Sequence, residues 1–337
     1  MLLEDIQAFA ERYGLGTEAV SELLLMMRRA YAASFNPSSG ESLGSDREYA
    51  ADGEDSPTVP GDNRAETYID EGPLGSGAMG LVRRVRDPAL NRSMAMKVMR
   101  PEMMDNPQAV SRFIEEAQTT AQLQHPGILP VFEIGVDPEG RTYFTMQEVT
   151  GGTLKDVIAE LHAAAAPGRW RSTRGGWTFR RVINAFRQAC DAVAYAHSRG
   201  VVHRDLKPEN IMVGKHGEVL VLDWGLAKVL GTALADSGET PVIAVRQSRE
   251  TRDGTIAGTP VYMPVEQARG DIAEIDQRAD VYALGAVLYE ILTGRPPYDA
   301  PTGREVIDMI VAGPPPRVPV QELDVAGTGR WRVGGMR

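Results

Sequence analysis

The sequence predicts an α+β fold built from two unlike lobes, a β-rich lobe followed by an α-rich one. From about Tyr68 onward, the stretches LVRRVRDP, SMAMKVM and YFTMQEV alternate apolar and polar residues as strands do. Helical periodicity is present at residues 108–123, before the third of these strands, and then at 154–161, 179–198 and 280–292. A mostly β segment followed by a mostly α segment favours two separately built lobes.

The composition limits the class of protein. The chain has 337 residues, of which 42% are hydrophobic, and that is enough for a large core. The formal net charge of -10 argues against a protein that binds nucleic acid through a wide basic face. The single cysteine, Cys190, excludes an internal disulfide and fits a reducing compartment. It lies among apolar residues at helical spacing, which favours a packing role over a reactive thiol.

The N-terminal part predicts no targeting signal and no membrane span. MLLEDIQAF carries acids where a secretory signal would carry Lys or Arg, and no segment reaches roughly 18 uninterrupted apolar residues. We therefore expect a soluble, cytoplasmic chain. Residues 1–35 predict a helical segment of two short amphipathic helices, which either bind a partner or pack on the lobes. Residues 36–66 are rich in Ser, Gly, Pro, Asp and Glu and predict a disordered acidic linker.

The stretch LGSGAMGLV contains a G-x-G-x-x-G spacing formed by Gly75, Gly77 and Gly80. Alone, this spacing fits either a dinucleotide-binding turn or an ordinary tight turn. A dinucleotide site needs a helix directly after the glycines, whereas here LVRRVRDP alternates and then breaks at Asp87-Pro88. The glycines are therefore expected in a β-hairpin. Its backbone N–H groups can cover phosphates because no Cβ blocks the approach.

Charged residues follow at positions that suit phosphate chemistry. Lys97 lies in a predicted strand after the hairpin, where it is either an edge residue or a phosphate ligand. Glu115 and Glu116 lie on the next helix, and Glu116 is in phase with its apolar face. Further on, Asp205 and Lys207 lie in the stretch VVHRDLKPEN.

That stretch ends at Asn210 and is followed by an apolar strand, and a second strand ends at Asp223. Carboxylate, lysine, amide and second carboxylate are what phosphoryl transfer requires. They supply a base for the attacking hydroxyl, a cation for the γ-phosphate and two oxygen ligands for Mg²⁺.

These motifs together resemble those of the eukaryote-like Ser/Thr protein kinases, in their bacterial form. LGSGAMGLV, AMK, the helix glutamate, HRDLKPEN, DWG, GTPVYMPVEQA and DVYALGAVLYEILTGRPPY occur in family order between residue 68 and about residue 312. The lysine of DLKPEN is typical of the Ser/Thr enzymes. The resemblance implies a two-lobed protein-kinase fold, with the N-lobe and hinge at 67–149 and the C-lobe at 150–313.

The resemblance also implies a reaction and a role for each matched residue. The reaction is transfer of the γ-phosphate of Mg-ATP to Ser/Thr hydroxyls of proteins, including the chain's own activation loop during transient self-association. Asp205 would be the catalytic base and Lys207 the γ-phosphate contact, with Lys97 paired to Glu116. The Mg²⁺ ligands would be Asn210 and Asp223. The ATP-binding residues would be Leu74, Gly75, Gly77, Gly80, Val82, Ala95, Lys97, Gln147, Val149 and Met212, with Met146 at the gatekeeper position.

Four further residues are expected to have regulatory roles. Arg204 resembles the arginine that binds a phosphorylated activation loop. Thr251 and Thr255 are the candidate phosphosites, and Thr259 is expected to contact Asp205 and Lys207.

The sequence departs from the family pattern in its last part. Residues 314–337 predict an irregular Pro- and Gly-rich tail, so the C-lobe is expected to be truncated at its C-terminus. Glu266 would then be a buried carboxylate whose partner is missing or is replaced by Arg317, Arg330 or Arg332. An ATP-binding pseudokinase or signalling scaffold is therefore the alternative function. A small-molecule kinase is disfavoured, because GTPVYMPVEQA resembles the segment that protein kinases use to bind peptides.

Two surface features allow more than one interpretation. Residues 162–177 form an insertion with two tryptophans and several arginines, for which a solvated loop is favoured over a docking patch. Glu209 favours a basic residue in the substrate or is simply a solvated acid.

Overall fold

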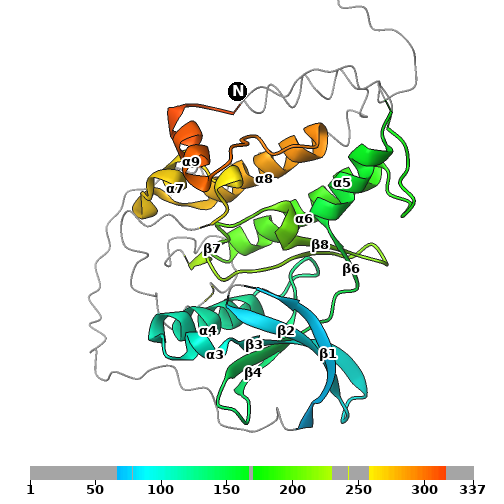
Figure 1. The fold of residues 1–337 in the computed structure, drawn as a ribbon, viewed down its shortest axis with the longest axis vertical. Coiled ribbons are helices and arrows are strands. Elements are labelled where there is room, and N and C mark those ends of the chain that lie inside the picture. The colour runs from blue at the N-terminus through cyan, green and yellow to red at the C-terminus, as the bar shows by residue number, and fades with distance from the viewer. Residues whose placement is uncertain (1–66, 78, 167–169, 230–241, 243–257, 316–337) are drawn as a thin grey trace, which may run out of the picture.

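The computed structural model describes residues 67–77, 79–166, 170–229, 242 and 258–315 (Figure 1). The expected helices of 1–35, the linker of 36–66 and the tail beyond residue 315 lie outside the described residues. In Figure 1 a small lobe of strands and one long helix lies below a larger, mainly helical lobe. The predicted α+β fold with a β-rich and an α-rich lobe is confirmed. No helix in the described ranges is both long enough and apolar enough to cross a membrane.

The small lobe is built on an antiparallel sheet of five strands. In chain order they are β1 (Ile69–Ser76), β2 (Gly80–Asp87), β3 (Arg92–Met99), β4 (Val131–Val136) and β5 (Thr142–Met146). The spatial order is β1-β2-β3-β5-β4. Three of these strands were predicted, and β1 and β4 were not. β1 is exposed along nearly all of its length, so it lacks the apolar alternation that reveals a half-buried strand.

The long helix of the small lobe packs against this sheet. After the short α3 (Pro101–Met104), α4 (Pro107–Gln122) begins at Asn106, whose side chain accepts hydrogen bonds from two backbone N–H groups of the first turn. Phe113 of α4 packs on Phe144 of β5, with ring centroids 5.1 Å apart. This contact fixes which face of α4 meets the sheet, and Glu116 lies on that face because it is one turn further along.

The large lobe consists of helices around a few short strands. Its helices are α5 (Leu154–Ala164), α6 (Phe179–Ser198), α7 (Val265–Arg269), α8 (Gln277–Thr293) and α9 (Gly303–Ala312), and its strands are β6 (Gly151–Thr153), β7 (Val201–Val202), β8 (Ile211–Gly214), β9 (Val219–Val221) and β10 (Lys228–Val229). A capping box between Thr153 and Asp156 begins α5, and Gly294, with a φ of 73°, ends α8.

One apolar cluster joins α5, α6 and α8 with the short strands beneath them. Cys190 of α6 belongs to this cluster and is 9% exposed. Burial raises the pKa of its thiol to about 12, so the thiol is protonated at neutral pH. Cys190 is therefore a packing residue.

The segment between α5 and α6 differs from the solvated loop that was expected. Trp170 stacks on Phe179 with ring centroids 4.8 Å apart, and the ring of His162 meets it edge-on at 5.0 Å. Trp177 lies under the guanidinium of Arg181, at 4.0 Å. Both tryptophans pack against the main core of the large lobe. The expected exposure is seen at Arg171, Ser172, Arg174, Gly175 and Gly176, whereas the two tryptophans are packed rather than solvated.

Candidate active site

The glycine-rich stretch forms the expected hairpin between β1 and β2. The Gly77 N–H donates to the Gly80 carbonyl at 2.8 Å, which closes the turn. A Cβ on Gly80 would lie 2.8 Å from the Val98 carbonyl oxygen, so only glycine fits there, whereas no atom lies within 4 Å of a Cβ built on Gly75. Arg100 anchors the tip by donating from Nε to the Gly77 carbonyl at 3.1 Å. Gly75 therefore leaves open backbone surface at the hairpin, whereas Gly80 is required by its close packing on β3.

Lys97 and Glu116 form an ion pair between the sheet and α4. Lys97 lies on β3 opposite Val82, and its Nζ is 2.6 Å from Glu116 Oε1. Burial raises the pKa of Glu116, and the nearby charge of Asp223 raises it further, while Lys97 opposes both. Among the described residues the ammonium is fixed by this one carboxylate, which leaves its remaining N–H bonds available to an anion.

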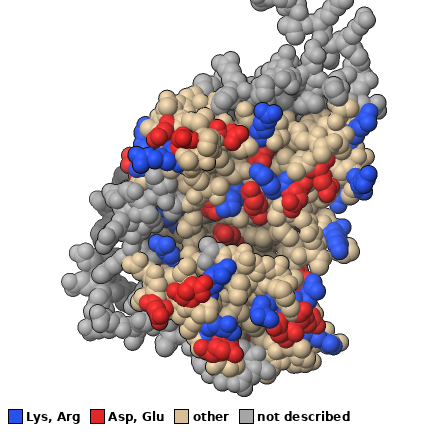
Figure 2. All heavy atoms as spheres, in the orientation of Figure 1, with Lys and Arg blue, Asp and Glu red and all other residues tan. Residues whose placement is uncertain are grey.

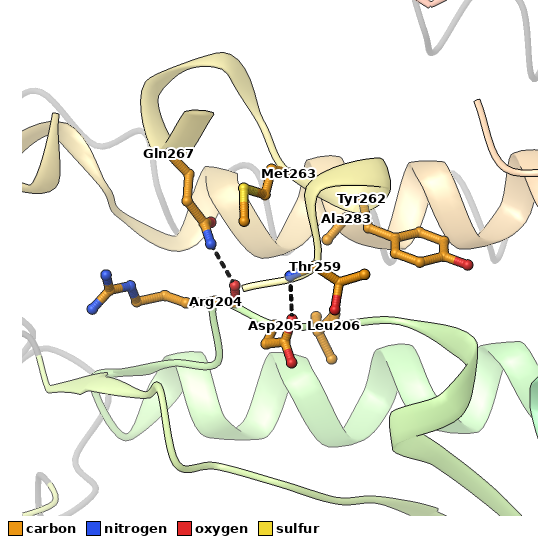
Figure 3. Close-up of a pocket in the computed structure, with 8 residues that line it drawn as sticks. All are labelled: Arg204, Asp205, Leu206, Thr259, Tyr262, Met263, Gln267 and Ala283. Carbon is orange, nitrogen blue, oxygen red and sulfur yellow. Dashed lines mark hydrogen bonds between the residues drawn. The ribbon is translucent and has the colours of Figure 1, made fainter. Parts of the chain in front are cut away.

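Asp205 lies at the centre of a second network (Figure 3). Its Oδ1 accepts from the backbone N–H of Thr259 at 2.8 Å, and its Oδ2 is 2.6 Å from Lys207 Nζ. Lys207 also donates to Thr259 Oγ1 at 2.7 Å. Asn210 Nδ2 donates to the Asp205 carbonyl at 2.9 Å. The structure therefore brings together the candidate base, the candidate phosphate contact and Thr259.

The backbone just before Asp205 is held by a residue that was not among the predicted site residues. Asp280, 1% exposed on α8, accepts from the backbone N–H groups of His203 at 2.8 Å and Arg204 at 2.9 Å. His197 Nε2 is 2.8 Å from the same carboxylate. Burial alone would raise the pKa of Asp280, but its hydrogen bonds and the two histidines lower it overall. The sequence feature that could have identified Asp280 is an acidic residue in the first turn of an otherwise apolar helix.

The two candidate Mg²⁺ ligands, Asn210 just before β8 and Asp223 just after β9, lie at the same end of this antiparallel strand pair. The amide nitrogen of Asn210 donates to Asp205, which leaves its oxygen available as a ligand. Asp223 is exposed and has a φ of 63°, an unusual conformation outside glycine. Within the described residues, no group of three or more His, Cys, Asp or Glu could hold a metal ion. One carboxylate and one amide oxygen nevertheless fit Mg²⁺, which usually keeps several waters and shares its remaining positions with phosphates.

The expected adenine-binding residues come from both lobes. Val82 and Ala95 lie on β2 and β3, and Met212 lies on β8 of the large lobe. Leu74, on the exposed β1, is 41% exposed. The Gln147 N–H is occupied by the Pro130 carbonyl at 3.0 Å, so Gln147 offers only its own carbonyl.

Val149 lies just beyond β5 in the connection to the large lobe, and Met146 is the last residue of β5, opposite Ala95.

Arg204 lies among other cations. Burial lowers the pKa of its guanidinium, and the charge of Arg112 on α4 lowers it further, despite the opposing charge of Asp280. The pKa of Lys228 is lowered by burial and by the charge of Arg204. Arg204 Nε is buried without a hydrogen-bond partner among the described residues. Thr251 and Thr255 lie outside the described residues, so their distance to this cluster is not defined.

Glu266 does not match the expectation of a buried carboxylate. It is partly exposed and lies in the first turn of α7, where the helix dipole favours negative charge. The three arginines considered as its partners lie outside the described residues.

Comparison with known proteins agrees with the motifs and the geometry. The protein kinase domain matches residues 68–319. The chain is 41% identical over 227 residues to the serine/threonine-protein kinase PknD of Protochlamydia amoebophila, which covers 67% of this chain and 23% of that protein. It is 39% identical over 228 residues to the serine/threonine-protein kinase PknB of Mycobacterium tuberculosis, covering 67% of this chain and 32% of that protein.

The chain thus spans only 23% to 32% of the length of these curated relatives. The matched part contains both lobes, the glycine hairpin, the Lys97–Glu116 ion pair and the network around Asp205. By these matches the chain belongs to the protein kinase family, with bacterial serine/threonine-protein kinases among its relatives.

Proposed function

We propose that this chain is a Ser/Thr protein kinase that transfers the γ-phosphate of ATP to hydroxyl groups of proteins. The observation that carries the proposal is the network in which Asp205, Lys207 and Thr259 are joined by hydrogen bonds of 2.6–2.8 Å. The carboxylate suits an attacking hydroxyl, and the ammonium suits the phosphoryl group that is transferred. Ser/Thr specificity is supported by the similarity to bacterial serine/threonine-protein kinases.

Each residue has a defined task in this proposal. Asp205 orients the acceptor hydroxyl and accepts its proton as the oxygen attacks the γ-phosphorus, while the bond from that phosphorus to the bridging oxygen breaks and ADP leaves. Lys207 stabilises the charge that develops on the γ-phosphate oxygens. Lys97, fixed by Glu116, binds the α- and β-phosphates beneath the glycine hairpin. Bound Mg²⁺ supplies charge neutralisation at the phosphates, and Asn210 and Asp223 would hold it. The ring of ATP would lie between Val82, Ala95, Met212 and the backbone of Gln147 and Val149, below Leu74.

Regulation by phosphorylation of the activation loop belongs to the same proposal. Arg204, Arg112 and Lys228 gather positive charge with one buried guanidinium N–H left unpaired. A phosphate on Thr251 or Thr255 would supply the missing acceptor and could be added by a second copy of the chain during transient association. We place the domain in the cytoplasm, where ATP is available, with the N-lobe and hinge at 67–149 and the C-lobe at 150–313.

The proposal is tested by replacing Asp205 with Asn. Transfer of labelled phosphate from Mg-ATP to a generic protein substrate should fall by about 100-fold or more, because the general base is lost. The matched control is Asp105→Asn, which neutralises an exposed carboxylate of the small lobe outside the site. Equal transfer by the Asp205 variant and wild type would remove Asp205 from its role. No transfer by wild type, with Mg-ATP still raising the melting temperature, would favour an ATP-binding pseudokinase.

A further inference from the structure

The surface next to the candidate base contains an ionic cluster that the proposed reaction does not use. Tyr262 lines the small pocket beside Asp205 and Thr259 (Figure 3). Its hydroxyl donates to Glu290 Oε2 on α8 at 2.6 Å. Tyr262 therefore connects this cluster to the pocket that Asp205 lines.

Lys155 pairs with the other oxygen of the Glu290 carboxylate. Its Nζ is 2.6 Å from Glu290 Oε1 and 3.6 Å from Glu209 Oε1. Glu290 is 3% exposed, whereas the side chains of Lys155 and Glu209 are 38% and 45% exposed. A buried carboxylate and an exposed one thus converge on a single ammonium at the surface. Burial alone would lower the pKa of Lys155, but Glu290 and Glu209 outweigh burial and raise it, so the ammonium stays charged.

The position of Glu209 places this cluster where a bound peptide substrate would pass. Glu209 lies four positions after Asp205, in the short helical turn Pro208–Asn210. An extended peptide advances by about 3.3 Å per residue, so residues a few positions from the acceptor pass over groups this close to the base. Two convergent carboxylates without Lys155 would form a site for a basic side chain of such a peptide.

We propose that Lys155 is a specificity-determining residue. Its ammonium occupies, from within the chain, the place where an arginine or lysine of the substrate would otherwise bind. The chain then phosphorylates segments that carry no basic residue at that position. This inference rests on the proposed kinase function and narrows its substrate class to peptides that do not need a basic flank.

The test compares wild type with Lys155→Met, which keeps the side-chain length and removes the charge. Each protein receives peptides with one Ser or Thr acceptor in a neutral background, with Arg, Ala or Asp placed in turn at every flanking position. Both kcat/KM and the binding of matched peptides with Ala in place of the acceptor are measured, the latter by fluorescence anisotropy. Lys155→Arg is the conservative variant, and Lys215→Met removes an exposed lysine of the β8–β9 turn as a control.

We expect wild type, Lys155→Arg and Lys215→Met to show no preference for Arg over Ala at any position. Lys155→Met should gain a preference of about ten-fold for Arg at one position, in kcat/KM and in binding, because one charge-assisted hydrogen bond is worth about that factor. Asp at the same position should become disfavoured. Adding Glu209→Gln to Lys155→Met should reduce the gain.

Two results would overturn the inference. One is a strong preference for Arg in wild type at the position where Lys155→Met shows it. The other is an unchanged profile of Lys155→Met in both measurements while its melting temperature stays near that of wild type. If Lys155→Met does not fold, Lys155→Gln keeps a hydrogen-bond donor for Glu290 and decides in its place. Absence of transfer by every protein would refute the kinase proposal, and the binding measurement would still decide the role of Lys155.

Discussion

Asp280, in the first turn of α8, holds the backbone of the loop that carries Asp205. Its carboxylate accepts two successive backbone N–H groups, those of His203 and Arg204. Arg204 has a φ of 70°, which costs energy for any residue other than glycine. The Gln267 side chain adds a hydrogen bond to the Arg204 carbonyl at 2.7 Å. These contacts hold the peptide that positions Asp205.

Replacing Asp280 with Asn should lower the free energy of unfolding by about 3 kcal/mol at neutral pH, because an amide N–H₂ would face donors that need an acceptor. The folded-state pKa of Asp280 lies below the ordinary value of 3.8. Its stabilising contribution is therefore present above 3.8 and is lost as the pH falls through the folded value. Urea unfolding of both proteins should show their difference shrinking toward acid pH. Asp308→Asn, an exposed change on α9, should show no such difference.

Residue roles could be predicted from the sequence where the partners lie in one motif or occur in a fixed order. Asp205, Lys207 and Asn210 lie within six positions, so their chemistry was visible directly. Asp280 lies 77 positions from His203, and Lys155 lies 135 positions from Glu290. Folding brings the members of each pair together, and no local sequence pattern indicates that they meet. The roles of Asp280 and Lys155 were therefore missed.

At the scale of elements, the helices were better predicted than the strands. The helix α6 was placed with its observed ends because its apolar residues recur at helical spacing along its length, and in the structure the Thr178 side chain caps its first turn. β4 was missed because its residues are mostly only partly buried and include Gly135. A Cβ at Gly135 would lie 2.6 Å from the Tyr143 hydroxyl on the neighbouring strand, so only glycine fits at this position.

The segment between α5 and α6 gives a prediction about stability. Trp170→Ala should lower the free energy of unfolding by about 2 kcal/mol, because the stacking on Phe179 and His162 is lost and a cavity is left. Leu90→Ala, at a side chain 64% exposed in the β2–β3 turn, should change it by less than about 0.5 kcal/mol. Thermal and urea unfolding measure both. Equal stability of the two variants would mean that the aromatic stack adds nothing to the fold.

On the scale of the whole molecule, charges of both signs are mixed on the face that Figure 2 presents, and the described residues of that face form no wide basic area. The site itself carries more acid than base. Asp205 and Glu116 are each matched by one lysine, whereas the exposed Asp223 has none within salt-bridge distance among the described residues. The phosphates of ATP bring further negative charge, so the nucleotide and Asp223 repel each other unless a cation lies between them.

The excess of acid predicts that Mg²⁺ decides how strongly ATP stabilises the fold. ATP with Mg²⁺ at about 100 times its dissociation constant should stabilise the folded state by about 2.7 kcal/mol. ATP with EDTA should stabilise it much less, because the phosphates then face Asp223 directly. In Asp223→Asn this difference should shrink, since the repulsion falls and a metal ligand is weakened, while Asp105→Asn should behave as wild type. Thermal melting measures all of these, and equal stabilisation by ATP with and without Mg²⁺ in wild type would rule out a metal held by Asp223.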